Sequence, residues 1–192
     1  MRKLLPVLVA FCAAGCFNEP EPAYKSVPAE NRVYLSDKGL KAVPEVNATA
    51  DYLNLDRNQL TNVSAVAALT GLKWLRLNDN KLAALPDLKG LVNLRRIYLK
   101  NNRFAAVPET LKDLPALTDI DLSGNPVKEV PQWLAEKKGL KNLSFSRTQV
   151  SKLPENLEAW TSLQCLQLGD LNIPAAEMAR IRGALPNVAI VF

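Results

Sequence analysis

The stretch "LRRIYLKNNRF", Leu94 to Phe104, decides the fold. Apolar residues alternate with charged or polar residues as far as Leu99, and Asn102 follows three positions later. Successive side chains of a strand point to opposite faces, so this alternation predicts a short strand with one buried face. The residues expected on its other face are charged or aromatic: Arg96, Tyr98 and Lys100.

The same pattern recurs along the chain at a nearly constant period. Its first apolar position falls at steps of 22 or 23 residues, at Leu72, Leu94, Leu117, Leu140 and Leu163. About seven such units fill residues 30–192. A repeat of this length is typical of solenoids, in which each unit buries its apolar face against its neighbours.

These units resemble the leucine-rich-repeat family, whose pattern is L-x-x-L-x-L-x-x-N-x-L. The resemblance implies an α/β repeat solenoid, a horseshoe with a parallel concave sheet and an irregular or short-helical convex side. The stretch Leu60 to Gly71 resembles internalin-type repeats, whereas later units with an "LP" pair, such as Leu85-Pro86, resemble the LPX type. Both subfamilies belong to proteins that bind other proteins, and neither carries catalysis in its repeats.

The asparagines of the pattern are interpreted as structural. A buried amide can bond the backbone of the bend after each strand, because buried polar groups need partners. The slot holds Asn58, Asn80, Asn102 and Asn125, but Lys38, Thr148 and Leu171 replace asparagine in three units. At the C-terminus a helix is expected over 174–183, with proline at its start and glycine at its end. Alternating apolar residues at 188, 190 and 192 then predict a last strand.

Residues 1–15 are predicted to be a lipoprotein signal peptide. Two basic residues precede an apolar run of about eleven residues, too short for a membrane-spanning helix of about twenty. The segment Ala13-Ala14-Gly15-Cys16 resembles the lipobox of bacterial lipoproteins, although alanine replaces the leucine usual three residues before the cysteine. The resemblance implies cleavage before Cys16 and a lipid anchor on it. An ordinary cleaved signal with incidental cysteines is the alternative.

Residues 16–29 would then be the lipidated cysteine and a spacer, and 30–192 the repeat domain. "NEPEPAYKSVPA", Asn18 to Ala29, is rich in proline and typical of a stiff linker. Acyl chains would hold the protein on a membrane of the cell envelope. Phe17 after the cysteine, by resemblance to Gram-negative lipoproteins, favours the outer membrane if the organism is Gram-negative. Removal of Cys12 with the signal peptide and lipidation of Cys16 would leave Cys165 without an intramolecular disulfide partner.

Stacked units place their outward side chains in columns about 4.8 Å apart. We name the surface formed by these columns the concave face. Tryptophan, tyrosine and arginine dominate binding hot spots, so aromatic residues on this face are expected to be exposed anchors. Its cations predict a protein partner with an acidic surface. The candidate partner-binding residues are Tyr52, Trp74, Arg76, Arg96, Tyr98, Lys100, Asp119 and Asp121.

A second interpretation is that these charges pair with one another and keep the sheet soluble. Cross-strand pairs would join Arg76 to Asp79 or Asp56, and Arg96 to Asp119 or Asp121. Arg96 could also lie over Trp74 as a cation–π pair. The two interpretations are compatible, because an ordered charged face can also be recognised.

Catalytic residues, metal sites and cofactors are not expected. The chain has no histidine, which removes the commonest general base and metal ligand. Asp119 and Asp121 could form a carboxylate pair for glycoside chemistry, but the neighbouring arginines are expected to lower their pKa values and remove the acid role.

Bulk charge does not favour nucleic acid. The net charge of +5 includes Arg2 and Lys3, without which 22 basic residues face 19 acidic ones. We therefore expect a membrane-anchored binding module that recognises a protein partner through the concave face. The alternatives are a non-catalytic structural envelope lipoprotein and a binder of an anionic envelope glycan.

Overall fold

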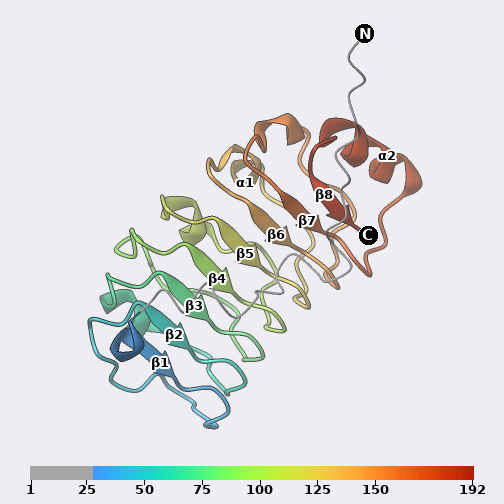
Figure 1. Cartoon of the computed structure of the whole chain (residues 1–192). Helices are drawn as coiled ribbons and strands as arrows, with labels where there is room; N and C mark the ends of the chain where they lie inside the picture. The colour runs from blue at the N-terminus through green and yellow to red at the C-terminus, as the bar shows by residue number, and fades with distance from the viewer. Residues whose placement is uncertain (1–27) are drawn as a thin grey trace.

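The computed structural model describes residues 28–192. The predictions for the signal peptide, for Cys16 and for the spacer as far as residue 27 lie outside these residues. Within 28–192 the chain forms one all-parallel sheet whose eight strands follow one another in chain order (Figure 1). The strands are β1 (Arg32–Tyr34), β2 (Tyr52–Asn54), β3 (Trp74–Arg76), β4 (Arg96–Tyr98), β5 (Asp119–Asp121), β6 (Asn142–Ser144), β7 (Cys165–Gln167) and β8 (Ala189–Val191).

The register of the sheet confirms the predicted columns. Tyr52 is the partner of Trp74, which is in turn the partner of Arg96. Arg96 pairs with Asp119 on the next strand. A shift of one residue would have exchanged the two faces of a strand, so this agreement fixes which side chains face outward.

Inward leucines and isoleucines form one continuous core. The middle residue of each strand from β2 to β7 is fully buried, namely Leu53, Leu75, Ile97, Ile120, Leu143 and Leu166. Each such side chain contributes roughly 1.5–3 kcal/mol by leaving water. The contribution repeats from β2 to β7, so burial of these side chains stabilises each of these units against its neighbours.

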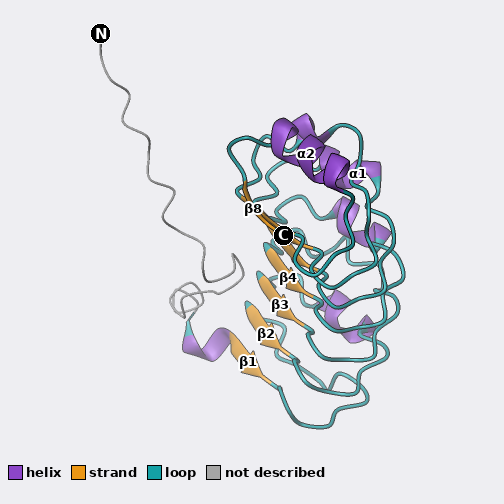
Figure 2. Ribbon diagram, turned by 90° about the vertical axis from the view of Figure 1, so that its right-hand side faces the viewer, coloured by secondary structure: helices purple, strands orange, loops and turns teal. Residues whose placement is uncertain are grey.

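Short helices close the core on the side opposite the strands (Figure 2). They are the 3-10 helices η3 (Ser64–Ala68), η4 (Glu109–Asp113) and η5 (Leu157–Ala159), and the α-helix α1 (Gln132–Glu136). A further 3-10 turn, η2 (Ala29–Asn31), precedes β1. Helices η3, η4, α1 and η5 each bury one or two apolar side chains against the leucine core: Val66, Leu111, Leu134 with Ala135, and Leu157.

The asparagines have the structural role that was predicted. The Asn80 amide nitrogen donates to the carbonyls of Leu55 and Leu77 at 3.0 and 3.1 Å, and its oxygen accepts from the N–H of Leu60 at 3.0 Å. Asn58, Asn102 and Asn125 make the equivalent bonds in their own units. Where threonine replaces asparagine, the Thr148 hydroxyl donates to the carbonyl of Phe145 at 2.7 Å.

A left-handed residue precedes the asparagine slot in every unit, a feature that the sequence did not predict. These residues have φ between 53° and 68° and are Asp37, Arg57, Asp79, Asn101, Gly124, Arg147 and Asp170. The left-handed conformation costs about 1–2 kcal/mol for a residue with a side chain. The backbone N–H of each of the first six donates to a carbonyl of the next unit, which ties the bends together.

The C-terminal unit is closed by the predicted helix and strand. Helix α2 (Ala175–Ala184) lies beside β8 at the end of the stack (Figure 1). Glu177 accepts from the backbone N–H of Leu153 at 2.9 Å, and Arg180 donates to the carbonyls of Leu153 and Pro154 at 3.0 and 3.1 Å. Among residues 28–192, neither α2 nor any other helix has the length and apolarity to cross a membrane.

Candidate functional site: the concave face

The structure brings all eight predicted residues onto the concave face. They come from four adjacent strands, β2 to β5, and from the residue two positions after β4. One column holds Tyr52, Trp74, Arg96 and Asp119, the next holds Arg76, Tyr98 and Asp121, and Lys100 lies in the third. The face is therefore assembled from residues up to 69 positions apart in the chain, Tyr52 to Asp121.

The aromatic residues of this face are buried, so the prediction of exposed anchors is wrong. Tyr52, Trp74 and Tyr98 are 4%, 7% and 5% exposed, and Tyr52 and Trp74 form a small cluster of their own. Side chains on neighbouring strands cover one another: the rings of Tyr34 and Tyr52 lie 5.4 Å apart, and the Arg76 guanidinium lies 5.2 Å from the Tyr98 ring. Burial raises the pKa of Tyr52 to about 12.

Tyr34 is an exposed aromatic residue that is not among the predicted site residues. Tyr34, on the edge strand β1, is 51% exposed, and its ring is tilted by 45° against the ring of Tyr52. Its exposure could have been predicted from its place in the first unit, because the edge strand β1 pairs with a neighbouring strand on one side only.

The charged residues pair across strands as the second interpretation predicted. Arg76 donates from Nε to the Asp56 carboxylate at 2.8 Å, and Arg96 Nε lies 3.8 Å from Asp119. The cations lie above the acids: the side chains of Arg76 and Arg96 are 32% and 27% exposed, whereas those of Asp56 and Asp119 are 5% and 7% exposed. The cation–π contact joins Arg76 to Tyr98.

Asp119 and Asp121, the two carboxylates considered for catalysis, are buried and accept hydrogen bonds. Asp119 accepts from the Asn142 amide at 2.6 Å, and Asp121 accepts from the backbone and hydroxyl of Ser123. Burial raises the pKa of Asp121 despite these bonds and the positive charges of Lys100 and Arg147, so the prediction of a lowered pKa is wrong for this residue. Among residues 28–192, histidine, cysteine, aspartate and glutamate form no group of three that could hold a metal ion.

Two hydrogen-bonding groups of the face are buried without a partner. Trp74 Nε1 and Ser144 Oγ are the side-chain atoms of this kind in the described part of the chain. The other two tryptophans satisfy their indole N–H, Trp133 with Glu109 and Trp160 with the carbonyl of Leu134, both at 2.8 Å. The missing acceptor therefore distinguishes the tryptophan of the concave face from those outside it.

Cys165 lies in the same column as Trp74 and Arg96. Its side chain is 3% exposed and disulfide-bonded. The other two cysteines, Cys12 and Cys16, lie outside the described residues, so the expectation that cleavage and lipidation leave Cys165 without an intramolecular partner stays a prediction for the processed protein.

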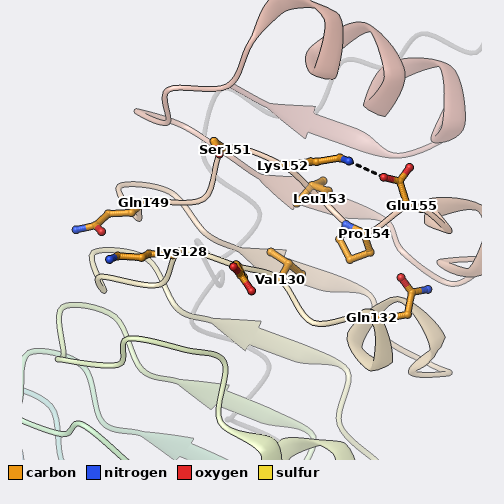
Figure 3. A pocket seen from close by; sticks show the side chains of 10 residues that line it. Lys128, Val130, Gln132, Gln149, Ser151, Lys152, Leu153, Pro154 and Glu155 are labelled. Atoms are coloured by element: carbon orange, nitrogen blue, oxygen red, sulfur yellow. Dashed lines mark hydrogen bonds and ion pairs between the residues drawn. The ribbon is translucent and has the colours of Figure 1, made fainter.

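A separate hollow of about 630 Å³ lies between the loops that follow β5 and β6 (Figure 3). Its lining includes the apolar residues Val130, Leu153 and Pro154 and the ion pair of Lys152 with Glu155, at 2.5 Å. None of the predicted site residues contributes to this hollow. The sequence does not predict this hollow, because it forms only where the loops of two successive repeats meet, and each loop has ordinary polar residues.

Comparisons with known proteins agree with this geometry. A family model described as leucine rich repeat matches residues 70–127. The chain is similar to the leucine-rich-repeat protein LIC12759 of Leptospira interrogans, with 31% identity and a TM-score of 0.71 over 76% of this chain and 38% of that one. It is also similar in fold to an internalin of Listeria monocytogenes, with 22% identity and a TM-score of 0.66 over 76% of this chain and 42% of that one.

The chain thus spans about two fifths of the length of each of these two structures. A search of the curated proteins found no match.

Proposed function

Because the chain is a leucine-rich-repeat protein similar to bacterial proteins of this kind, we propose that it is a membrane-anchored binding module of the cell envelope, which holds a protein partner on its concave face. The observation that carries the proposal is the fixed arrangement of that face. Arg76, for example, is held between the Asp56 carboxylate and the Tyr98 ring. A face whose side chains are already ordered loses less conformational entropy when a partner docks.

The proposed partner has an acidic surface. A partner would meet the cationic layer first, because the side chains of Arg76 and Arg96 reach further into solvent than the acids beneath them. Arg95, at the entry to β4, adds an exposed cation beside this layer. The buried acids weaken the attraction, so charge would direct the approach of the partner more than it would determine the final affinity.

The proposed anchor is a lipid on Cys16, after removal of a signal peptide that covers residues 1–15. Its support is the lipobox-like segment that ends at Cys16 and the basic and apolar residues before it. Residues 17–29 would act as the spacer. The proposed location is the outer membrane if the organism is Gram-negative, as Phe17 after the cysteine favours.

Binding of an anionic glycan is less well supported than binding of a protein. Proteins hold sugars by stacking them on open aromatic faces, whereas Tyr52, Trp74 and Tyr98 are covered by their neighbours. The third possibility, a structural lipoprotein without a specific ligand, gives no reason for an ordered face of this kind.

Affinity capture from envelope extracts tests the proposal. The full-length protein is immobilised through a C-terminal tag, and proteins retained at low salt are identified and quantified. We expect one protein in a stoichiometric amount, released by raised salt. Retention of purified cell wall or lipopolysaccharide instead would favour the glycan alternative, and retention of neither would favour the structural one.

A further inference from the structure

We propose that the indole N–H of Trp74 donates a hydrogen bond to a carboxylate of the bound partner. This inference rests on the proposed function and names the group that the concave face recognises. Its starting point is the unpaired state of Trp74 Nε1, which contacts no acceptor within residues 28–192. Trp133 and Trp160 both donate from the same atom at 2.8 Å.

An unpaired buried donor needs a physical explanation. More than nine in ten buried polar groups in proteins have a hydrogen-bond partner, because a buried donor without one loses its bond to water and gains nothing in return. Trp74 is 7% exposed, and its nitrogen is out of contact with solvent. A phenylalanine would fill most of this volume without introducing a donor. An acceptor supplied by a ligand accounts for the indole.

The surroundings of Trp74 favour an anionic acceptor. Trp74 pairs in register with Arg96, and the ammonium of the preceding residue, Lys73, lies 3.1 Å from Asp51. Arg95 is exposed one position before Arg96. An indole can only donate, and a hydrogen bond to a charged oxygen is about twice as strong as one to a neutral oxygen. The carboxylate of aspartate or glutamate is the anion that an unmodified protein offers.

The donor becomes accessible if a neighbouring side chain moves. Arg96, the register partner of Trp74, has a long, flexible side chain that is 27% exposed. A partner carboxylate that attracts the Arg96 guanidinium would turn it toward itself and reach the indole beside it. Arginine and indole would then bind the two oxygens of one carboxylate, which selects for the planar shape of that group.

Nuclear magnetic resonance of the ¹⁵N-labelled full-length protein tests this contact, because each tryptophan gives one indole N–H signal. The signals are assigned with Trp74→Phe and Trp133→Phe, which keep an aromatic ring at each position. The probes are polyglutamate, polyglutamine of equal length, and polygalacturonate as a sugar carboxylate. We expect polyglutamate to shift the Trp74 signal while the Trp133 and Trp160 signals stay in place.

Three results would overturn the inference. No selective shift of the Trp74 signal by polyglutamate would show that the indole does not meet a carboxylate. An equal shift with polyglutamine would show that the acceptor is a neutral amide or backbone carbonyl. A shift with polygalacturonate alone would transfer the site to a glycan. Failure here is distinct from failure of the proposed function, because capture of a protein from the envelope can persist in Trp74→Phe.

Discussion

A Cβ atom placed on Gly124 would lie 2.1 Å from Oδ1 of Asn101, in the bend of the preceding unit. Gly124 also has φ of +68°, so two effects oppose a side chain at this position. We predict that Gly124→Ala lowers the free energy of unfolding by about 2 kcal/mol, because Asn101 must move and loses its 2.7 Å bond to Asp79. Urea unfolding measures the loss.

Gly39→Ala is the matched control for this prediction. Gly39 has nearly the same φ, +65°, but a Cβ there would meet no atom within 4 Å. We expect a smaller loss of about 1 kcal/mol, the lower end of the cost of the left-handed conformation, because only the backbone preference changes. Equal losses in the two variants would show that contact with Asn101 is unimportant.

Asn80→Ala should be among the most damaging single changes outside the apolar core. It removes the acceptor for the N–H of Leu60 and the donor to the carbonyls of Leu55 and Leu77, all buried. We predict a loss of about 3 kcal/mol, since each buried group left unpaired costs about 1–3 kcal/mol. Asn93, whose amide makes one exposed bond of 3.3 Å, provides the control, and Asn93→Ala should change stability by less than about 0.5 kcal/mol. A small effect of Asn80→Ala on urea unfolding would mean that water reaches the bend.

The periodic positions of the fold could be read from the sequence because each depends on residues nearby in the chain. Alternation around Leu75 and Ile97 determines which side chains point inward, and the asparagine offset determines where the chain bends. The burial of Trp74 could not be read in the same way. It depends on side chains about twenty residues away, such as Tyr52, and on how closely they pack across the strands.

The same reason explains the error on Asp121. Its sequence neighbours suggested an open, positively charged surface, whereas its pKa is set mainly by burial. The left-handed residues were missed because the signal at that slot is weak: glycine occupies it in one unit, and aspartate, asparagine or arginine in the others.

The raised pKa of Asp121 predicts a pH dependence of stability. A carboxyl with a folded pKa above its unfolded value binds its proton more tightly in the folded state. Its favourable contribution is therefore complete below the unfolded pKa of about 3.9 and is lost as pH rises through the folded pKa. We expect Asp121→Asn to raise the melting temperature at pH 7 and to have little effect near pH 3.

The exposed residue Asp87 serves as the comparison, because its pKa is shifted in the opposite direction. The bonds from Lys89 lower the pKa of Asp87, so its contribution is present above its unfolded pKa and lost as pH falls through the folded one. Asp87→Asn should therefore be neutral or slightly destabilising at pH 7. If Asp121→Asn were the more destabilising of the two at pH 7, the hydrogen bonds to Ser123 would outweigh the cost of burying the charge.

The proposed lipid anchor predicts a change of location in Cys16→Ser. Serine cannot form the thioether to diacylglycerol, so the variant should leave the detergent phase or retain its signal peptide at a higher mass. Detergent phase partitioning, combined with measurement of the mass of the product, distinguishes both outcomes from the behaviour of the wild-type protein. Cys165→Ser is the control for general effects of cysteine removal and should remain in the detergent phase. A Cys16→Ser protein of mature mass that still partitions into detergent would refute the anchor.

Charge reversal at the border of the concave face tests how a partner is attracted. Arg76 is unsuitable, because glutamate there would lie beside the buried Asp56 and destabilise the fold. Arg95 and Arg103, on either side of β4, are both exposed, so Arg95→Glu with Arg103→Glu should leave the melting temperature nearly unchanged. We predict about tenfold weaker binding of the captured partner at low salt, mainly through slower association. The association rates of the variant and of the wild-type protein should approach each other at high salt, because the Debye length shortens to about 3 Å at 1 M.

A second pair of substitutions, Lys112→Glu with Lys138→Glu, makes the same change in net charge on the side of the short helices, where both lysines are exposed. If attraction depended on net charge alone, this pair would slow association as much as Arg95→Glu with Arg103→Glu. We expect a clearly smaller effect, because its charges lie across the solenoid from the proposed docking surface and beyond one Debye length of about 8 Å at physiological ionic strength. Association rates measured over a salt series for both pairs decide the matter. Equal slowing would remove the concave face from the recognition step, and a larger effect from the lysine pair would place the partner on the helical side.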